Sequence, residues 1–243
     1  MVAAAPASGK TTMLSALFFF IPKFEKVVTL EEDVNELKAR IDITNTVELY
    51  GSRNHGVSTR EQLINALRMR PGRIVVGEVR GEEARELFSS ANLGIPFVTT
   101  MHSNSGGIDI VKKLLVKPMS VEGRSLSMLD VALYMKHTDI AARLLSDVYE
   151  YRWLSRAETE RIGIEVGDGD AVDISVIVSS GKLDAGALQN SKVIAAFSKK
   201  KGVSRHSALK EFEKRSEFLR VACAACKTSD ELMDKVQGYG LQD

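Results

Sequence analysis

Short apolar runs, each followed by a stretch with helical spacing, make up the first half of the chain. The runs are not interrupted by alternating polar residues, which is typical of parallel strands covered on both faces. In one helical stretch, Leu63, Ala66 and Leu67 follow the i, i+3, i+4 spacing of a buried helix face. The predicted strands are 27–30, 74–76 and 96–101, and the predicted helices are 59–69, 82–92 and 108–116. This alternation predicts an α/β fold with a mostly parallel sheet and helices on both faces.

Two later apolar segments predict further strands of the same sheet. They cover residues 130–135 and 147–153, and we expect them to extend the sheet in antiparallel fashion. A turn-rich segment at 165–170, which contains two glycines and two aspartates, then marks a boundary.

Beyond this boundary the pattern becomes helical. The predicted helices are 190–201 and 204–226. Gly202 stands between them as an expected C-cap, and Ser204 is an expected N-cap. We therefore expect a core formed by residues 1–165 and a small C-terminal helical subdomain formed by residues 170–243.

Composition excludes several classes of protein. With 44% hydrophobic and 27% charged residues, the chain has enough apolar material for a globular core. The formal net charge of +1 gives no overall field that would attract nucleic acid or an anionic membrane. The apolar run 13–21 is too short to span a bilayer, and we expect a helix that is buried on both sides.

The chain has two cysteines, Cys223 and Cys226, and both lie in one short stretch. They give no basis for a disulfide framework, which favours a reducing cytosol. Two cysteines are also too few for a zinc site, which needs four ligands. We expect them to pack in the core on one helix face.

The segment APASGKTT at residues 5–12 nearly completes a phosphate-binding loop. The pattern G-x-x-x-x-G-K-[ST] has Ala4 in place of its first glycine, which costs little if the φ angle there is negative. Backbone N–H groups would meet phosphate oxygens, Lys10 would neutralise the β- and γ-phosphates, and the Thr11 hydroxyl would bind Mg²⁺. The predicted nucleotide-binding residues are Ala5, Pro6, Ala7, Ser8, Gly9, Lys10, Thr11 and Thr12. On this segment alone, an ordinary glycine turn before a helix is the alternative.

Three further motifs narrow the interpretation. They read VTLEEDVNEL at 28–37, RMRPGRIVVGEVRGEEA at 68–84 and TTMHSNS at 99–105. In this order they resemble the acidic box, the Walker B segment and the histidine box of the type II/type IV secretion ATPase superfamily. These proteins are the motors of pili, archaella, secretion and conjugation. The resemblance covers residues 1–150, and the loop is similar to that of the archaeal branch.

The resemblance implies a RecA-like P-loop ATPase that uses ATP and Mg²⁺. It implies a homo-oligomeric ring, which in this family is usually a hexamer. It also implies a cytoplasmic location, peripheral at the inner face of the cell membrane. Its expected partner is a polytopic membrane platform protein, and no specific nucleic acid is predicted. The expected function is to power assembly of a pilus, an archaellum or a protein secretion system. Two alternatives stay open: a truncated nucleotide-binding remnant without ATPase activity of its own, and a conjugation-type motor for DNA or protein.

Candidate catalytic residues come from the same three motifs. Glu78 follows the strand 74–76 and can reach the crevice at the carboxyl end of the sheet, where by resemblance it polarises the attacking water. Glu32 is the best match to the acidic-box glutamate, with Glu31 as a competitor because the segment is one residue longer than the pattern. His102 follows an apolar strand and by resemblance senses the γ-phosphate. The alternatives are a surface ion pair for Glu78, a solvated helix start for Glu32 and a structural role for His102.

Three arginines are candidates for contact with the nucleotide of a neighbouring subunit. Arg68, Arg70 and Arg80 could meet its phosphates, because arginine suits transition-state charge. The alternative for each is an ordinary ion pair with one of the glutamates at 82, 83 and 86. Gly77 stands where many P-loop proteins have a metal-binding aspartate, which leaves Thr11 as the main protein ligand to Mg²⁺.

The start of the chain departs from the family pattern. Only residues 1–3 precede the loop, and we expect them to be too few for the strand that feeds it. The family carries earlier strands and an N-terminal domain. The sequence is therefore expected to be a fragment of a longer reading frame or a shortened homologue whose front comes from another chain. Either case puts ATPase activity of the chain alone in doubt.

Overall fold

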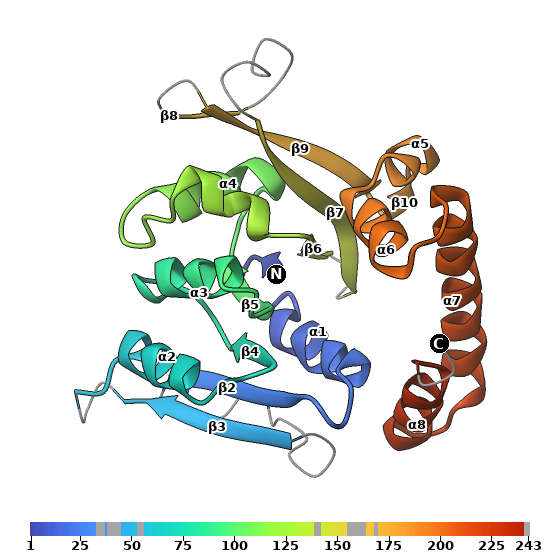
Figure 1. The fold of residues 1–243 in the computed structure, drawn as a ribbon, viewed down its shortest axis with the longest axis horizontal. Coiled ribbons are helices and arrows are strands. Elements are labelled where there is room, and N and C mark those ends of the chain that lie inside the picture. The colour runs from blue at the N-terminus through green and yellow to red at the C-terminus, as the bar shows by residue number, and fades with distance from the viewer. Residues whose placement is uncertain are drawn as a thin grey trace.

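A computed structural model describes residues 1–32, 37, 45–52, 56–138, 142–154, 164–167 and 170–240. In these parts of the chain the strands form a single ten-stranded sheet (Figure 1). The strand order is β10-β9-β7-β6-β1-β5-β4-β2-β3, and β8 pairs with β9.

One half of the sheet is parallel. Its strands are β1 (Val2–Ala4), β2 (Lys26–Glu32), β3 (Asn45–Gly51), β4 (Arg73–Val76), β5 (Phe97–His102) and β6 (Ala132–His137). The helices between them are α1 (Lys10–Leu17), α2 (Thr59–Arg68), α3 (Glu83–Asn92) and α4 (Gly107–Leu115), with 3-10 turns η1 (Phe18–Phe20) and η3 (Gly123–Met128). The predicted parallel α/β core is confirmed.

Helices cover both faces of this half because successive strand residues point to opposite sides. In β4, Ile74 and Val76 belong to the large apolar cluster that includes residues of α2, α3 and α4. Val75, between them, belongs to a second cluster with Leu14 and Phe18 of α1 and η1. The predicted covering of both faces is therefore confirmed.

Three details of the parallel half differ from expectation: β3 was not predicted, and the other two concern β1 and the run 13–21. Residues Val2–Ala4 do form a strand, β1, which is fully buried and pairs in parallel with both β5 and β6. Three residues suffice because two neighbouring strands supply all of their ladder partners. The apolar run 13–21 is not buried on both sides, since the helix gives way to η1 and Phe20 is 53% exposed.

The other half of the sheet is antiparallel. Its strands are β7 (Arg143–Leu154), β8 (Ile164–Gly167), β9 (Asp170–Ser179) and β10 (Lys182–Leu183). Both predicted strands, β6 and β7, extend the sheet, but only β7 is antiparallel, since β6 runs parallel to β1. The prediction that the chain is helical from residue 170 is wrong for 170–183, because β9 pairs with β7 along most of its length and continues the sheet. Residues 168 and 169 of the predicted turn lie outside the described residues.

Helices follow these strands from residue 185. They are α5 (Ala185–Gln189), α6 (Lys192–Lys201), α7 (Arg205–Ala225) and α8 (Ser229–Gly240). Gly202 ends α6 in the left-handed conformation, with a φ of 67°, and the Ser204 hydroxyl caps α7 by accepting from Ser207 N–H. Both predicted caps are confirmed. Whether the chain divides into two domains stays a prediction.

The C-terminal helices lie beside the sheet (Figure 1). In α7 only Ala208 and Ala222 are buried. Cys223 is consequently exposed and Cys226 partly so, and the expected core position of the two cysteines is wrong. None of the helices in the described parts of the chain combines the length and the apolarity needed to cross a bilayer.

Candidate functional site

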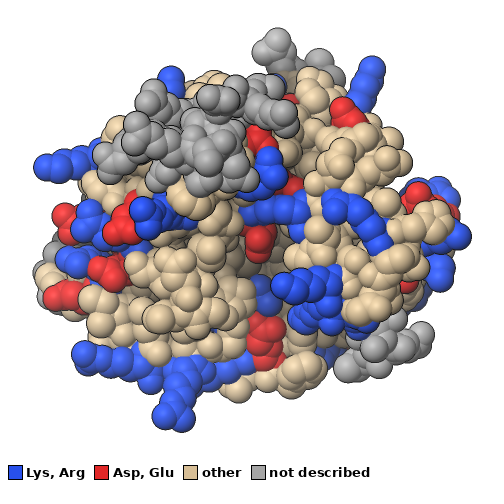
Figure 2. Space-filling view, turned by 45° about the horizontal axis from the view of Figure 1, so that its top comes forward, with Lys and Arg blue, Asp and Glu red and all other residues tan. Residues whose placement is uncertain are grey.

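The carboxyl ends of the parallel strands open into a polar cavity of about 520 Å³. On the face seen in Figure 2, acidic and basic side chains border a central hollow. Ligands of open α/β sheets bind at such carboxyl ends. The cavity is lined by residues from the predicted loop, from the ends of three strands and from the starts of α2 and α3: Pro6, Ala7, Lys10, Thr11, Leu30, Glu31, Glu32, Thr59, Gly77, Glu78, Arg80, Gly81, Glu83, Thr100 and His102.

The loop leads from β1 into the first turn of α1. Ala4 is an extended strand residue, so the missing glycine has no conformational cost there. Gly9 precedes α1 in the left-handed region, with a φ of 86°, which glycine adopts without strain. Ala7 is left-handed as well, with a φ of 59°, although it has a β carbon. Ser8 and Lys10 are buried.

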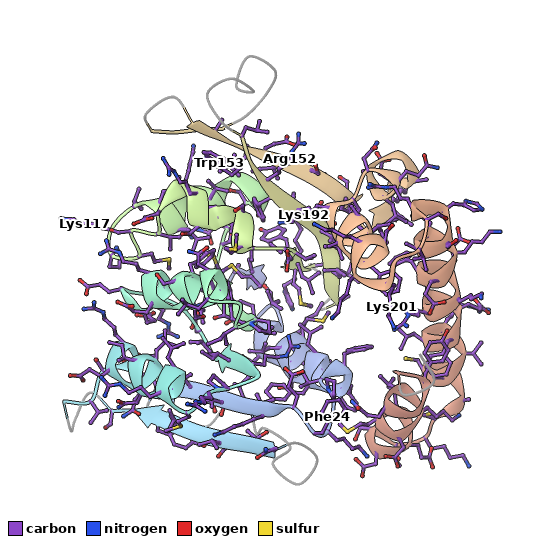
Figure 3. All side chains as sticks on the ribbon, in the orientation of Figure 1. Phe24, Lys117, Arg152, Trp153, Lys192 and Lys201 are labelled. Atoms are coloured by element: carbon purple, nitrogen blue, oxygen red, sulfur yellow. The ribbon has the colours of Figure 1, made fainter. Side chains whose placement is uncertain are left out.

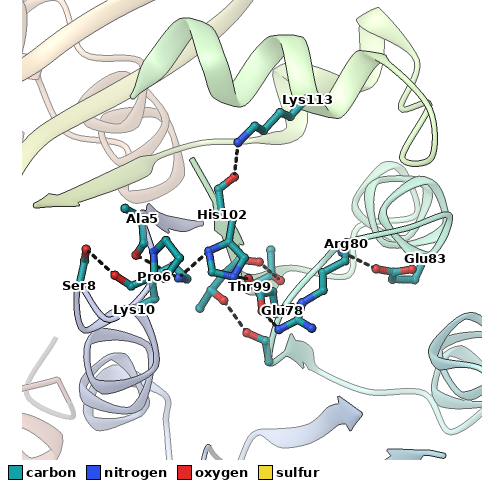
Figure 4. Close-up of polar contacts among 12 residues, drawn as sticks. Ala5, Pro6, Ser8, Lys10, Glu78, Arg80, Glu83, Thr99, His102 and Lys113 are labelled. Carbon is teal, nitrogen blue, oxygen red and sulfur yellow. Dashed lines mark hydrogen bonds and ion pairs between the residues drawn. The ribbon is translucent and has the colours of Figure 1, made fainter. Parts of the chain in front are cut away.

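A chain of polar contacts joins this loop to β5 and β4 (Figure 4). Lys10 Nζ lies 3.4 Å from the Ala5 carbonyl oxygen and 3.2 Å from His102 Nδ1. Because an ammonium group only donates, Nδ1 must accept, and the ring proton then resides on Nε2. His102 Nε2 lies 2.9 Å from Glu78 Oε1. The structure thus brings together Lys10, His102 and Glu78 from three separate segments.

Glu78 is held from a second side by Arg80. The Arg80 Nε donates to Glu78 Oε2 at 2.7 Å, and the Nη2 atom pairs with the same oxygen. The backbone N–H groups of Arg80 and Gly81 donate to Glu83 Oε1 at 2.6 and 2.8 Å. These contacts fix the turn after β4, so the Glu78 carboxylate is oriented before any ligand arrives.

The acidic box places both of its candidate glutamates at the cavity. Glu31 is buried, and its Oε1 accepts from Leu37 N–H at 2.8 Å. A β carbon on Gly77 would lie 3.3 Å from Glu31 Cγ, so Glu31 fills the space beside Gly77. Glu32 is partly exposed. The competition between Glu31 and Glu32 stays open, and residues 33–36 of this motif lie outside the described residues.

The loop after β5 is tied to α4. Lys113 Nζ donates to the His102 carbonyl at 3.1 Å. Asp109 accepts from Ser103 Oγ at 2.8 Å and from Asn104 N–H at 2.9 Å, and it pairs with Lys113 at 3.3 Å. Burial alone raises the pKa of Asp109, but the bonds from Asn104, Ser103 and Lys113 outweigh it and lower the pKa below its usual value.

The three candidate arginines are not equivalent. Arg80 lies at the cavity, whereas Arg68 and Arg70 are exposed and do not line it. They flank Met69, whose carbonyl accepts from Lys26 at the amino end of β2, on the side of the sheet opposite to the loop. The contact predicted for Arg68 and Arg70, with the phosphates of a neighbouring subunit, stays a prediction.

Ion pairs with Glu82 and Glu86 were the alternative for the three candidate arginines. The structure shows that Arg60, which the sequence did not suggest, makes them instead. Arg60 Nη2 lies 2.9 Å from Glu86 Oε1, and its Nη1 lies 3.5 Å from Glu82 Oε2. Two further residues near the loop and the cavity were also missed. Thr59 opens α2 at the cavity, and Arg143 of β7 donates from Nε to the Ala7 carbonyl at 3.2 Å. Arg143 is more than a hundred residues from the loop in sequence, so no motif links them.

Oxygen ligands for a divalent cation are present at the cavity. Thr11, Glu31 and Glu32 line it, and hydroxyl and carboxylate oxygens suit Mg²⁺. No group of three or more His, Cys, Asp or Glu among the described residues is arranged to hold a metal ion by itself. The residues therefore fit an Mg²⁺ ion that shares its ligands with a phosphate group, not a site built from protein alone.

Comparison with known proteins identifies the family of this chain. A family model described as Type II/IV secretion system protein matches residues 1–132, which is more than half of the chain. The chain belongs to this family. The motifs at 28–37, 68–84 and 99–105 all lie within the matched residues.

Individual relatives agree with this family. An uncharacterized protein of Methanocaldococcus jannaschii, MJ1287, is 29% identical over 98% of this chain and 87% of its own length. The protein VirB11 of Rhizobium radiobacter is 38% identical over 66% of this chain and 49% of its own length. The structure of the VirB11 ATPase of the Brucella suis type IV secretion system, in complex with sulphate, has a TM-score of 0.53 and 29% identity. That match covers 61% of this chain and 48% of the Brucella protein, so this chain spans about half the length of both VirB11 proteins.

Proposed function

We propose that this chain is the nucleotide-binding part of an ATPase of the type IV secretion kind. The observation that carries the proposal is the contact chain from Lys10 through His102 to Glu78. It lies at the carboxyl edge of the sheet, beside the loop in which Ala7 and Gly9 have left-handed backbone conformations. The family membership and the similarity to VirB11 proteins support it.

Each residue of the cavity then has a chemical role. The loop N–H groups and Lys10 bind the phosphates of ATP at the amino end of α1, where the helix dipole favours anions. Thr11 would hold Mg²⁺ through its hydroxyl, and the carboxylates of Glu31 and Glu32 line the same cavity and would lie close to the ion. When bound, Mg²⁺ neutralises charge on the phosphates.

Glu78 accepts the proton of the attacking water. Arg80 donates to one carboxylate oxygen and His102 Nε2 lies 2.9 Å from the other, so the two residues flank the carboxylate on separate sides. Because Lys10 contacts His102, a phosphate that draws Lys10 toward itself also changes the partner of His102 Nδ1. His102 thereby reports the presence of the nucleotide to Glu78 and, through Lys113, to α4.

The relatives' names support a finer proposal. VirB11 of Brucella suis is an ATPase of a type IV secretion system, and PtlH of Bordetella pertussis, 40% identical over 48% of this chain and 35% of its own length, is a type IV secretion system protein. We therefore favour a role in a type IV secretion system over assembly of a pilus or an archaellum. The proposed assembly is a homo-oligomeric ring, by family habit a hexamer, at the cytoplasmic face of the membrane against a membrane platform protein.

The proposal is tested by ATP hydrolysis and ATP binding of the purified chain. Glu78→Gln keeps the shape of the side chain but not its basicity, so we expect turnover to fall by about 100-fold or more. ATP affinity should change less than about threefold, since Glu78 acts on water and not on the phosphates. Glu82→Gln is the matched control, because the Glu82 side chain is 72% exposed and its ion pair, at 3.5 Å, is with Arg60 and not with a residue of the proposed catalytic chain.

The outcomes separate the open alternatives. If Glu78→Gln and the unaltered chain hydrolyse ATP equally fast, the catalytic role of Glu78 is wrong. If the unaltered chain binds ATP without hydrolysing it, the chain is the nucleotide-binding remnant. Stimulation of turnover by DNA would favour the conjugation-type motor.

A further inference from the structure

Arg143 lies across the phosphate loop although it belongs to the antiparallel half of the sheet. It is the first residue of β7, which pairs with β6, and β6 in turn pairs with β1. Its Nε donates to the Ala7 carbonyl at 3.2 Å. Its Cδ lies 3.0 Å from the point that a β carbon on Gly9 would occupy. The side chain thus meets the loop at two positions, once by a hydrogen bond and once by packing.

Both of these loop positions have unusual backbone conformations. Ala7 and Gly9 are left-handed, with φ angles of 59° and 86°. Glycine adopts this conformation without strain, but alanine does so only when surrounding contacts impose it. The bond from Arg143 to the Ala7 carbonyl is such a contact, since it fixes the peptide unit that follows Ala7.

The orientation of that peptide unit decides what the loop can bind. In a trans peptide the carbonyl and the next N–H point in opposite directions. When the Ala7 carbonyl points toward Arg143, the N–H of Ser8 therefore points away from Arg143. A phosphate loop needs its N–H groups turned inward, because phosphate oxygens only accept hydrogen bonds.

We propose that Arg143 is a positioning residue that holds the phosphate loop in its anion-binding conformation through the Ala7 carbonyl. The inference rests on the proposed function, since the anion is the phosphate chain of a nucleotide. It assigns to β7 a direct part in nucleotide binding that the sequence motifs do not contain.

Two substitutions at this position separate the hydrogen bond from the charge. Arg143→Met keeps a stem of similar length but has no donor. Arg143→Gln places an N–H donor the same number of bonds from the backbone as the arginine Nε, but carries no charge. The control is Arg152→Met, at the far end of the same strand (Figure 3), where Arg152 is exposed and lies 3.6 Å from Asp173.

The measurement is the dissociation constant for ADP, by titration of each purified variant. We expect Arg143→Met to weaken binding about tenfold, a typical effect for a lost charge-assisted bond. Arg143→Gln should restore binding to within about threefold of the unaltered chain, and Arg152→Met should leave it unchanged. The melting temperature of the variants without nucleotide should stay within a few degrees, because Arg143 is exposed.

Three results would overturn the inference. Unchanged binding in Arg143→Met removes the role altogether. Equally weak binding in Arg143→Met and Arg143→Gln leaves only an effect of charge. If the unaltered chain binds no ADP, both the proposed function and this inference are wrong. The first two results contradict this inference alone and leave the proposed function intact.

Discussion

The two halves of the sheet use their polar residues differently. In the parallel half, neighbouring strands all end at the same edge, so side chains that follow β1, β4 and β5 meet there. Lys10, Glu78 and His102 come together for this reason. In the antiparallel half, successive strands end at opposite edges, and no such convergence can arise from strand ends alone.

Polar groups of the antiparallel half tether a helix instead. Glu150 of β7 is buried and accepts from Ser191 Oγ at 2.5 Å and from Lys192 N–H at 2.7 Å. Lys192 Nζ donates to the carbonyls of Ser127 and Leu129, both at 3.0 Å, and burial lowers the pKa of Lys192. The difference teaches that parallel strands bring polar residues together at one edge by their direction alone, whereas a polar residue of the antiparallel half needs a particular partner, here the start of α6.

The largest effect is expected in the parallel half, for Lys10→Ala. A charge-assisted bond contributes about 1.5–3 kcal/mol, and Lys10 is proposed to meet more than one phosphate oxygen, so ADP affinity should fall by about 100-fold. The measurement is the same titration with ADP, and Lys117→Ala, an exposed lysine beyond α4 (Figure 3), should bind as the unaltered chain does. Equal affinity in Lys10→Ala would break the comparison, because the edge where the strands meet would then not be a phosphate site.

A smaller effect, on stability and not on binding, is expected in the antiparallel half. Glu150→Ala leaves the buried Ser191 hydroxyl and the Lys192 N–H without their acceptor. The free energy of unfolding should fall by about 2 kcal/mol, measured by urea denaturation. ADP affinity should stay within about twofold, and exposed Glu213→Ala should change neither quantity. A loss of ADP affinity as large as that in Lys10→Ala would show that the polar contacts of the antiparallel half also control nucleotide binding.

The smallest effect concerns the loop that carries His102, and it depends on pH. The pKa of Asp109 is lowered in the folded protein, so Asp109 stabilises the fold above its ordinary pKa of about 3.9 and this contribution is lost as the pH falls below it. Asp109→Asn should therefore be about 1 kcal/mol less stable at pH 7 and approach the unaltered chain near pH 3. Asp234→Asn, whose side chain is 73% exposed, is the control. A stability difference that stays constant from pH 7 to pH 3 would contradict the assignment.

Sequence patterns predicted the parallel half best. There, uninterrupted apolar runs such as that of β4 and motifs such as the one around Glu78 are each contained in a few consecutive residues. The strand β1 was not predicted, because three residues show no pattern and are held only by β5 and β6. Likewise β9 was not predicted, since it is specified by its pairing with β7 and not by its own spacing.

The candidate site divides in the same way. His102 and Glu78 could be found because each follows a strand within a recognisable motif. Arg143 could not, since its contact with Ala7 exists only after β7 has paired with β6. Choosing between Glu31 and Glu32 also depends on side-chain packing beside Gly77, which a sequence pattern does not encode.

The most direct test of the central claim is a crystal structure of this chain with Mg²⁺ and a non-hydrolysable ATP analogue. The account predicts the triphosphate on the loop, with Lys10 Nζ bonded to phosphate oxygens and the Glu78 carboxylate facing the γ-phosphate. A contradiction would be an analogue bound elsewhere, for example in the apolar groove of about 460 Å³ that Phe20, Phe24, Phe218 and Tyr239 help to line, with Lys10 still bonded to His102.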